Sequence, residues 1–258
     1  MFLLSFDIEE FDMPFEYGKT IAFEDQIQIS ITGSTLILDL LAKHQLKATF
    51  FSTAVFAINA PEIIKRIITE GHELASHTYY HSKFEPADLL SSKLKLEELY
   101  GQKIYGFRMP RMMPVSDQEI ENAGYVYNSS INPTWLPGRY NNLGVSRTYF
   151  NQGRVIQLPA SVSPQLRIPL FWLSFHNFPL SVYQHLLKRT YQKDGYINIY
   201  FHPWEFTDLT NKEKYGFPSY VSRNSGTKMV ERMDQFMAWI NQQGYPSGSI
   251  YDFIKRVS

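Results

Sequence analysis

Cysteine is absent from this sequence of 258 residues. The chain therefore has no disulfide, no thiolate nucleophile and no sulfur ligand, so any bound metal ion depends on His, Asp and Glu side chains. An excess of one charge is missing as well, because 25 Lys and Arg residues balance 25 Asp and Glu residues. Nucleic-acid backbones and anionic membranes select basic surfaces, so we expect no nucleic-acid partner.

Long apolar runs are also missing. No stretch approaches the roughly 18 apolar residues that suggest a membrane-spanning helix. The first residues, MFLLSFDIEEFD, lack the basic flank and the length of a secretory signal. The sequence therefore predicts a cytoplasmic protein without a transmembrane segment, and it gives no indication of the oligomeric state.

What the sequence does contain is a repeated switch between strand-like and helix-like apolar periods. The pattern predicts strands over residues 2–9, 47–53, 72–77, 103–109, 125–130 and 196–201, and helices over 34–45, 61–71, 87–100, 116–123, 180–193 and 226–243. We expect Ser34 to cap the first helix, and residues 131–179 to form long loops with short strands. Residues 1–258 are therefore predicted to form a single α/β domain, with a mainly parallel sheet that closes as a barrel.

Polar residues follow several of the predicted strands. Asp7 and Glu9 end the first strand, His77 and His81 follow the third, Arg108 follows the fourth, and His202 and Glu205 follow a late one. Because active-site groups gather at the carboxyl ends of parallel strands, we expect these residues to converge at one rim of the sheet.

Each of these residues also has a simpler interpretation. Carboxylates two positions apart on a strand, such as Asp7 and Glu9, point to one side and are often just exposed. The histidines of SHTYYH are four positions apart, which suits a shared zinc-sized ion but is also common by coincidence. Arg108 can pair with a surface carboxylate, and His202 can be a satisfied histidine beside a core tryptophan. We expect the remaining histidines to be structural or exposed: His44, His72, His176 and His185.

Four motifs in this order, SFDIEE, SHTYYH, GFRMPR and YFHPWEF, resemble those of the NodB-type polysaccharide deacetylases, carbohydrate esterase family 4. The resemblance extends from residue 3 to about residue 206. The Asp-x-Glu opening and the His-Pro-Trp-Glu ending are similar to one branch of that family, which is linked to surface-polysaccharide synthesis. The resemblance implies a distorted (β/α)7-type barrel that hydrolyses N-acetyl groups on sugars with the help of a metal ion.

The resemblance also implies a role for each motif residue. His77 and His81 would bind a divalent ion together with one carboxylate. Zn²⁺ suits these ligands best, although Co²⁺, Ni²⁺ and Fe²⁺ suit them as well. Asp7 would be the general base, oriented by Arg108, and His202 would be the general acid that protonates the departing amine.

Two positions depart from the family's pattern. The first motif of the family has adjacent aspartates, whereas Ile8 follows Asp7 here, and Glu9 is the best substitute as a metal ligand. Glu10 should face the other way on a regular strand. The fourth motif of the family supplies an aspartate, and the corresponding stretch YNSSINPTW offers only Asn128.

Substrate contacts are expected around these residues. By resemblance, the backbone N–H of Arg111 would stabilise the oxyanion. Trp135, Tyr140 and Trp204 are candidates for an aromatic wall against a sugar ring, although large aromatic residues more often fill a core. Glu205 is also assigned to substrate binding.

Three hypotheses about function remain open from the sequence. The first is an N-deacetylase acting on an acetylated amino sugar of a surface glycan or its precursor. The second is a hydrolase of a small non-sugar amide, and the third is a sugar-binding relative that has lost turnover. The sequence does not identify the sugar or the native metal, because fold-level similarity does not determine the substrate.

Overall fold

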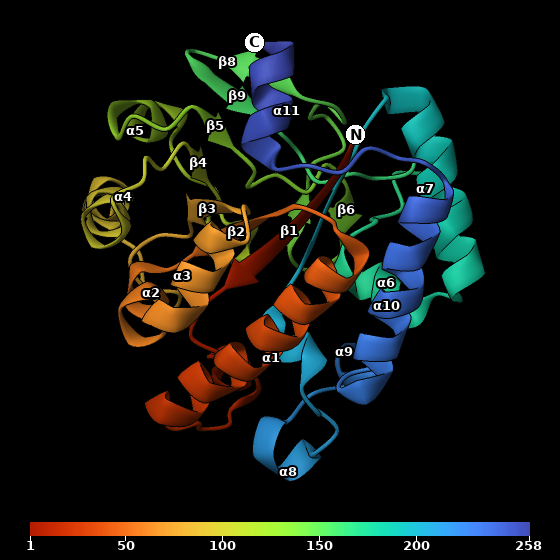
Figure 1. Cartoon of the computed structure of the whole chain (residues 1–258), viewed down its shortest axis with the longest axis horizontal. Helices are drawn as coiled ribbons and strands as arrows, with labels where there is room; N and C mark the ends of the chain where they lie inside the picture. The colour runs from red at the N-terminus through yellow and green to blue at the C-terminus, as the bar shows by residue number, and fades with distance from the viewer.

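A curled, mostly parallel sheet forms the centre of the protein, for which a computed structural model describes residues 1–258 (Figure 1). The strands follow the order β10-β1-β2-β3-β4-β5-β9-β8, and every neighbouring pair is parallel except β8 with β9. Their bounds are β1 (Phe2–Ile8), β2 (Ala48–Ser52), β3 (Glu73–Ser76), β4 (Gly106–Phe107), β5 (Tyr127–Asn128), β8 (Phe150–Gln152), β9 (Val155–Gln157) and β10 (Ile197–Phe201). A separate hairpin consists of β6 (Trp135–Leu136) and β7 (Tyr140–Asn141). The predicted α/β class and distorted (β/α)7-type barrel are confirmed, with the sheet in the form of a half-barrel.

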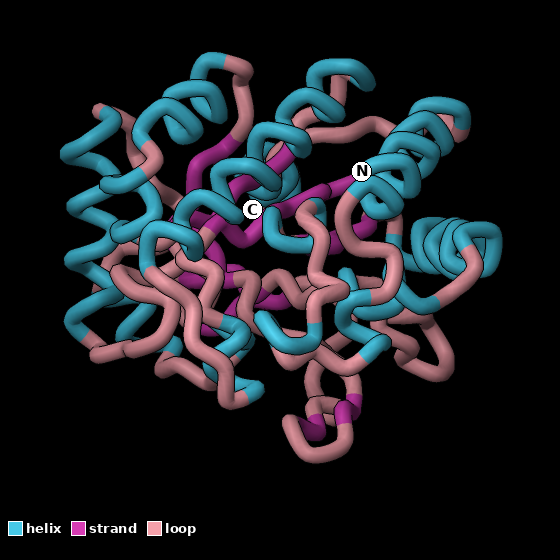
Figure 2. The backbone as a smooth tube through the Cα atoms, turned by 90° about the horizontal axis from the view of Figure 1, so that it is seen from below, coloured by secondary structure: helices cyan, strands magenta, loops and turns pink.

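Helices flank the sheet on one side, and longer loops cover the other (Figure 2). The α-helices are α1 (Phe23–His44), α2 (Ala54–Asn59), α3 (Pro61–Thr69), α4 (Ala87–Tyr100), α5 (Asp117–Asn122), α6 (Trp172–Asn177), α7 (Leu180–Asp194), α8 (Lys212–Tyr215), α9 (Ser219–Ser222), α10 (Thr227–Gln242) and α11 (Ile250–Val257). Short 3-10 helices lie at η1 (Met13–Tyr17), η2 (Pro110–Met112) and η3 (Pro203–Phe206). No helix combines the length and the apolarity that a bilayer crossing requires.

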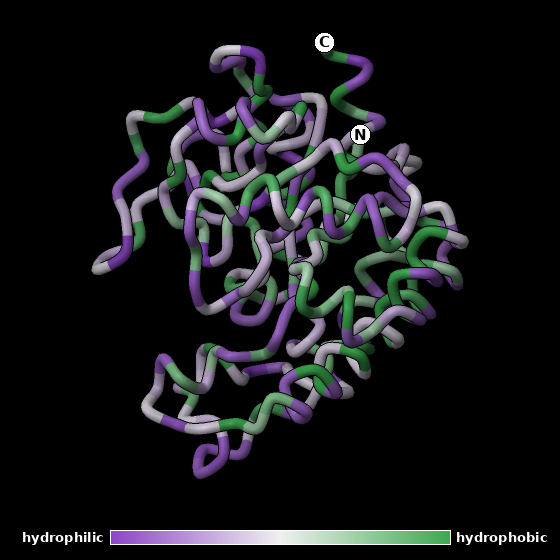
Figure 3. The backbone as a smooth tube through the Cα atoms, turned by 90° about the vertical axis from the view of Figure 1, so that its left-hand side faces the viewer, coloured by the Kyte–Doolittle hydropathy of each residue, from purple (hydrophilic) through white to green (hydrophobic).

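The two faces of β1 have different neighbours, because successive strand residues point to opposite sides. Phe2, Leu4 and Phe6 pack in the large core between the sheet and the helices. Leu3 faces the interior of the half-barrel, where it belongs to a second core that α11 closes at one end. Along α11, hydrophobic and hydrophilic residues alternate (Figure 3). Asp7 lies on the same side as Leu3, which directs its carboxylate to the interior at the carboxyl end of the strand.

The gap between the two edges of the sheet is bridged at Asn198 of β10. The backbone N–H of Ser161 donates to the Asn198 carbonyl at 2.7 Å, and the Asn198 N–H donates to Ser161 Oγ at 2.9 Å. The Asn198 amide also donates to the carbonyls of Leu158 and Pro159, at 3.2 and 3.1 Å. These contacts link the segment after β9 to β10, so one buried side chain joins the edges of the half-barrel.

The predicted helix at 34–45 is wrong at its start. Helix α1 begins at Phe23, and Ser34 is buried inside it instead of capping it. The preceding turns contain Ile, Ser, Thr and Gly33, which are poor helix formers, so the sequence alone gave little sign of them. Gly33 is required by packing, because a Cβ built there would lie 1.9 Å from the Pro203 carbonyl oxygen in η3. Helices α2, α6 and α11 were not predicted, and the single-domain assignment of residues 1–258 stays a prediction.

Candidate functional site

The residues expected at one rim do converge there. A cavity of about 320 Å³ opens at the carboxyl ends of the parallel strands. Its lining includes Asp7, Glu9, His77, His81, Arg111, Asn132, Tyr140, Trp172, Tyr200, His202 and Trp204. The segments that carry these residues are far apart in the chain, and the order of the strands brings their ends together.

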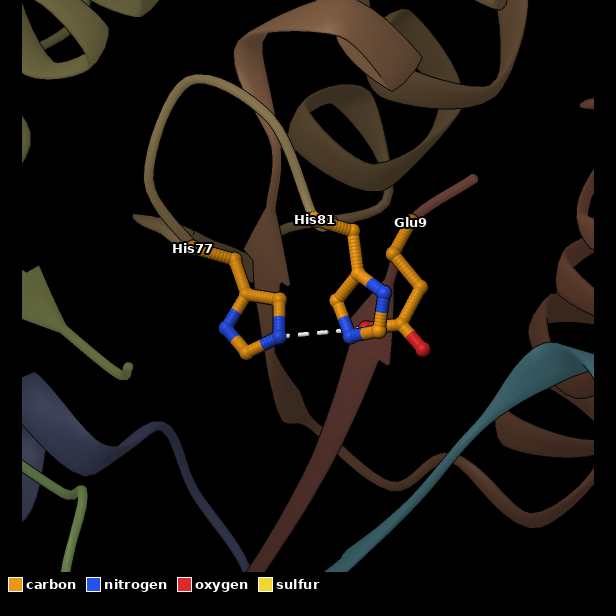
Figure 4. Close-up of side chains that lie close together, drawn as sticks. All are labelled: Glu9, His77 and His81. Carbon is orange, nitrogen blue, oxygen red and sulfur yellow. Dashed lines mark hydrogen bonds and ion pairs between the residues drawn. The ribbon is translucent and has the colours of Figure 1, made fainter. Parts of the chain in front are cut away.

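Glu9, His77 and His81 form a compact cluster within this cavity (Figure 4). One ligand atom from each residue lies within 4.8 Å of the others. His77 Nε2 and His81 Nε2 are each 3.1 Å from Glu9 Oε2, and the two rings are nearly parallel, 5.8 Å apart. All three residues are buried. The pair of histidines is therefore not a coincidence of spacing.

The hydrogen bonds of the outer ring nitrogens indicate what the cluster can hold. His77 Nδ1 lies 2.8 Å from the carbonyl of Arg108, which only accepts, so this nitrogen carries a proton. His81 Nδ1 lies 2.7 Å from the Asp12 carboxylate in the same way. Nε2 of both rings faces the carboxylate of Glu9, and a divalent ion bound between them would take the place of the Nε2 protons. The donor set of two imidazoles and one carboxylate fits a divalent ion such as zinc.

The electrostatics of the cluster favour an ionised Glu9. Burial alone would raise the pKa of Glu9, but the charges of His81 and His202 and the hydrogen bond from His77 lower it to about 2. Glu9 therefore stays ionised, as a metal-ligating carboxylate must be. Glu10, which was expected to face away, is outside the cavity lining and accepts a hydrogen bond from Thr53.

The loop that carries both histidines is held by backbone hydrogen bonds. The carbonyls of Thr78 and Tyr79 accept from the N–H groups of Ala54 and Val55, each at 3.1 Å, at the start of α2. Thr78 has a φ of 67°, a left-handed conformation that β-branched residues rarely adopt. Strain of this kind is kept where a functional geometry depends on it, and here it turns the chain between the two histidines.

Asp12 was not identified from the sequence, although it lies beside the predicted ligands. It is buried, accepts from His81, and receives both contacts of the Arg111 guanidinium at 3.0 and 3.1 Å. Arg111 also contacts Glu16 and the His81 carbonyl. Asp12 lies two residues beyond the motif SFDIEE. The direction of its side chain depends on the irregular path after β1, which periodicity does not predict.

Asp7 and Arg108 form a buried ion pair at the rim. Arg108 Nη1 lies 2.6 Å from Asp7 Oδ1, and the rest of the guanidinium donates to Ser129. Arg108 is fully buried, with its guanidinium over the ring of Phe51 at 4.1 Å. The free oxygen of Asp7 points toward His202 Nε2, 3.9 Å away. The Arg108 side chain thus fixes one carboxylate oxygen and leaves the other in the cavity.

The prediction that Glu205 contacts substrate is wrong, because this side chain is fully buried and does not line the cavity. Its Oε1 accepts from His202 Nδ1 at 2.9 Å and from the His202 backbone N–H at 2.6 Å. Burial disfavours the charged form of His202, but the hydrogen bond to Glu205 and the nearby carboxylates raise its pKa overall. Glu205 therefore holds His202 from behind, whereas Asn128 contacts Gln157 and Ser130.

The aromatic residues of the cavity differ in part from those predicted. Tyr140 and Trp204 line the cavity, and Trp204 stacks on the His202 ring with centroids 4.6 Å apart. Trp135 does not line it and is 59% exposed on the β6–β7 hairpin, so its assignment to the wall is wrong. Trp172 and Tyr200 line the cavity instead. Trp172 lies in α6, within the stretch predicted as loop, so no periodic signal pointed to it.

Comparison with known proteins gives matches to one family. A family model for polysaccharide deacetylases matches residues 20–126. A chitooligosaccharide deacetylase of Bradyrhizobium sp. (strain ANU 289) is 45% identical over 56 residues, 20% of this chain and 26% of that one. A peptidoglycan-N-acetylglucosamine deacetylase of Bacillus cereus is 32% identical over 105 residues, 40% of this chain and 37% of that one. The matches thus span between a quarter and two fifths of these curated relatives.

Solved structures share the fold over nearly the whole chain. A Mycobacterium smegmatis protein assigned to the polysaccharide deacetylases has a TM-score of 0.61 and 19% identity, over 96% of this chain and 86% of that one. An allantoinase has a TM-score of 0.59 and 15% identity, over 96% and 86%. A CE4 family pseudoenzyme from Bacillus anthracis has a TM-score of 0.53 and 15% identity, over 98% and 64%. At these identities the likeness shows the fold alone, and the sequence matches carry the predicted resemblance, which is confirmed.

Proposed function

We propose that this chain, which matches a polysaccharide deacetylase family model over residues 20–126, is a metal-dependent hydrolase that removes N-acetyl groups from an amino-sugar-containing glycan or glycan precursor. The observation that carries the proposal is one cavity that contains the Glu9–His77–His81 cluster, Asp7 and His202 together. The family match covers His77, His81 and Arg108, whereas Asp7, Glu9 and His202 lie outside it. The geometry thus adds the groups on which the sequence comparison is silent.

His77, His81 and Glu9 would hold the divalent ion. When bound, such an ion supplies Lewis-acid polarisation of the amide carbonyl and lowers the pKa of a coordinated water. Asp12 and the Arg108 carbonyl fix the orientation of the two rings, which keeps both Nε2 atoms directed at the same point. Outer contacts of this kind contribute strongly to metal affinity.

Asp7 and His202 divide the proton transfers. The oxygen of water adds to the acetyl carbonyl carbon, and Asp7 accepts the proton that the water loses. The C–N bond then breaks, and the nitrogen takes a proton from His202 Nε2, so acetate and a free amine leave. The separation of 3.9 Å between His202 Nε2 and Asp7 Oδ2 supports this division, because both groups would reach the same substrate amide. The ion pair with Arg108 holds Asp7 Oδ1 in place and leaves Asp7 Oδ2 directed into the cavity.

The size of the cavity suits a single sugar unit. A volume of about 320 Å³ is at the lower end of small-molecule sites. Tyr140 and Trp204 supply the aromatic faces that pack against sugar rings. A compact cavity would also admit a small non-sugar amide, and the shared fold of an allantoinase supports that second candidate. By resemblance to its branch, the chain would act in surface-polysaccharide synthesis, and the location stays a proposal.

The proposal is tested by elemental analysis of protein purified without chelator, together with acetate release from an acetylated chito-oligosaccharide, with and without added zinc or cobalt. We expect about one metal ion per chain and metal-dependent release of acetate. A metal-loaded protein that hydrolyses allantoin but not the acetylated sugar would favour the second candidate. A protein that binds no metal after reconstitution would contradict the proposal and favour a sugar-binding relative.

Two variants separate metal binding from proton transfer. His81→Ala should lose both metal and activity, because it removes one ligand of three. Asp7→Asn should keep the metal and slow turnover by roughly 100-fold or more, because the base is lost while the ligands remain. A fully active His81→Ala protein without metal would refute the assigned site.

A further inference from the structure

A second buried histidine lies directly behind the acid of the site. His176, in α6, is fully buried, and its Nε2 lies 2.7 Å from Glu205 Oε2. Glu205 contacts His202 through its other oxygen, at 2.9 Å. The three side chains therefore form a continuous row, His176–Glu205–His202, in which only His202 reaches the cavity.

The hydrogen bonds of His176 determine its protons. Its Nδ1 contacts the backbone carbonyl of Arg223, which accepts only, so Nδ1 carries a proton. Its Nε2 faces the carboxylate of Glu205. The histidines and their charges outweigh the effect of burial and lower the pKa of Glu205, which is therefore ionised. An ionised carboxylate also accepts only, so both nitrogens of His176 face groups that accept hydrogen bonds.

We propose that His176 is a positioning residue for the acid step: it holds Glu205 as a fixed, ionised acceptor, which keeps the proton of His202 Nδ1 in place and directs His202 Nε2 into the cavity. This inference rests on the proposed deacetylase function. Without His176, the buried Oε2 of Glu205 would have no donor, and the carboxylate would more readily take up the proton of His202 Nδ1. The contact of His176 with Glu205 Oε2 fixes the carboxylate, so the hydrogen bond from His202 Nδ1 to Glu205 Oε1 is maintained.

Hydrogen bonds from the surrounding segments hold the His176–Glu205–His202 row in place. Asn224 donates to the His176 carbonyl at 2.7 Å, and Asn177 donates to the Tyr220 carbonyl at 2.8 Å. The Glu205 carbonyl accepts from the backbone N–H of Gly226 at 3.1 Å. Helix α6, the α9 segment and the start of α10 are thereby tied around the row. Tyr220 also lines the cavity, so the same contacts link the acid to a wall of the site.

Matched substitutions at His176 isolate its contact with Glu205. In His176→Gln, the amide nitrogen takes the place of Nε2 and keeps a donor toward Glu205. In His176→Asn, the amide nitrogen takes the place of Nδ1 and keeps only the contact with Arg223. His185, exposed on α7, receives the same two changes as a control. We expect His176→Asn to lower kcat for acetate release from an acetylated chito-oligosaccharide by about 10-fold or more, with KM within about twofold.

We expect His176→Gln to recover most of that loss and the His185 variants to match the unmodified protein. A second substrate separates positioning from general damage. 4-Nitrophenyl acetate releases a phenolate that needs no proton, so its hydrolysis should fall less than about threefold in His176→Asn. Equal losses on the amide and on the ester, or equal activity of the Gln and Asn variants, would overturn the proposal.

A measurement on the unmodified protein is independent of activity. Long-range ¹H–¹⁵N correlation spectra report the protonation of every imidazole nitrogen, and His176→Gln assigns the His176 signals. We expect both His176 nitrogens to be protonated at neutral pH. If Nε2 of His176 carried no proton, the proposed hydrogen bond to Glu205 would be refuted even in an active enzyme. An inactive protein with the expected spectrum would instead contradict the deacetylase function and leave the His176–Glu205–His202 row standing.

Discussion

At the residue scale, the site was largely readable from the sequence because its chemistry requires particular side chains at strand ends. Asp7, His77, His81 and His202 all reach the cavity, as the motifs predicted. Asp12 and His176 were missed because each acts through another residue and stands outside any motif. Glu205 was identified but given the wrong role, since a sequence shows that a carboxylate follows a histidine and not which way it points.

Glu73 in β3 gives a residue-scale prediction about stability. Burial raises its pKa to about 7, even though Tyr251, Thr49 and Tyr127 donate hydrogen bonds to it. The folded state therefore prefers the neutral carboxyl, so the stability that it contributes is complete below its unfolded pKa of about 4.5 and is lost as the pH rises through about 7.

Glu73→Gln should abolish this loss of stability at rising pH, because glutamine does not ionise. Between pH 5 and pH 8, the free energy of unfolding of the unmodified protein should fall by up to about 3 kcal/mol relative to that of the variant. Urea denaturation at each pH measures the difference. Parallel pH profiles for the two proteins would show that Glu73 is not neutral in the folded state.

At the element scale, the strands and the long helices followed from periodicity, and α4 has the bounds expected for it. The predictions of helix bounds fail where a tertiary contact outweighs the helix propensity of the local sequence. Helix α1 extends eleven residues before its predicted start, through Ile, Ser, Thr and Gly33, because its buried face packs on the sheet and on η3. The sequence of that stretch predicts a weak helix, and only the packing partner stabilises it.

Gly33→Ala tests that contact. In an exposed helix this change would stabilise the protein by up to about 1 kcal/mol. Here the added Cβ would lie 1.9 Å from the Pro203 oxygen, so we expect a loss of about 1–3 kcal/mol. Because Pro203 follows His202, turnover should fall as well. Thermal denaturation and acetate release measure the two effects.

Thr32→Ala is the matched control, because Thr32 is the exposed neighbour of Gly33 in the same helix. It changes helix propensity without meeting η3, and it should leave stability and turnover nearly unchanged. If Gly33→Ala were as stable and as active as Thr32→Ala, the close approach of α1 to η3 would not matter for the position of His202.

At the scale of the whole molecule, the barrel class was predictable from alternating strands and helices, but the way its edges meet was not. The bridge at Asn198 depends on one side chain inside an apolar strand, INIYF, where it looks like an exception to the pattern. Its Nδ2 donates to the buried segment after β9. No rule of periodicity assigns such a residue to the closure of a sheet.

Asn198→Ala should weaken the whole fold. The Pro159 carbonyl would lose its donor, whereas the Leu158 carbonyl would keep its contact with Ser129 Oγ, and an unsatisfied buried group costs about 1–3 kcal/mol. Part of this cost is offset, because the substitution also removes Asn198 Oδ1, a buried acceptor that has no hydrogen-bond partner. We expect a net loss of about 2 kcal/mol in urea denaturation, and a larger one for Asn198→Asp, which buries a charge without the donors. Unchanged stability in both variants would show that the bridge does not hold the edges together.

The pairing of β1 with both β2 and β10 has a consequence for synthesis on the ribosome. Asp7 is synthesised nearly 200 residues before His202, which directly follows β10. Until then β1 is an edge strand with unpaired backbone groups, a state prone to association with other chains. A nascent chain that stops before β10 would thus carry Asp7, His77 and His81 without His202, and the exposed edge of β1 is what a chaperone would have to cover.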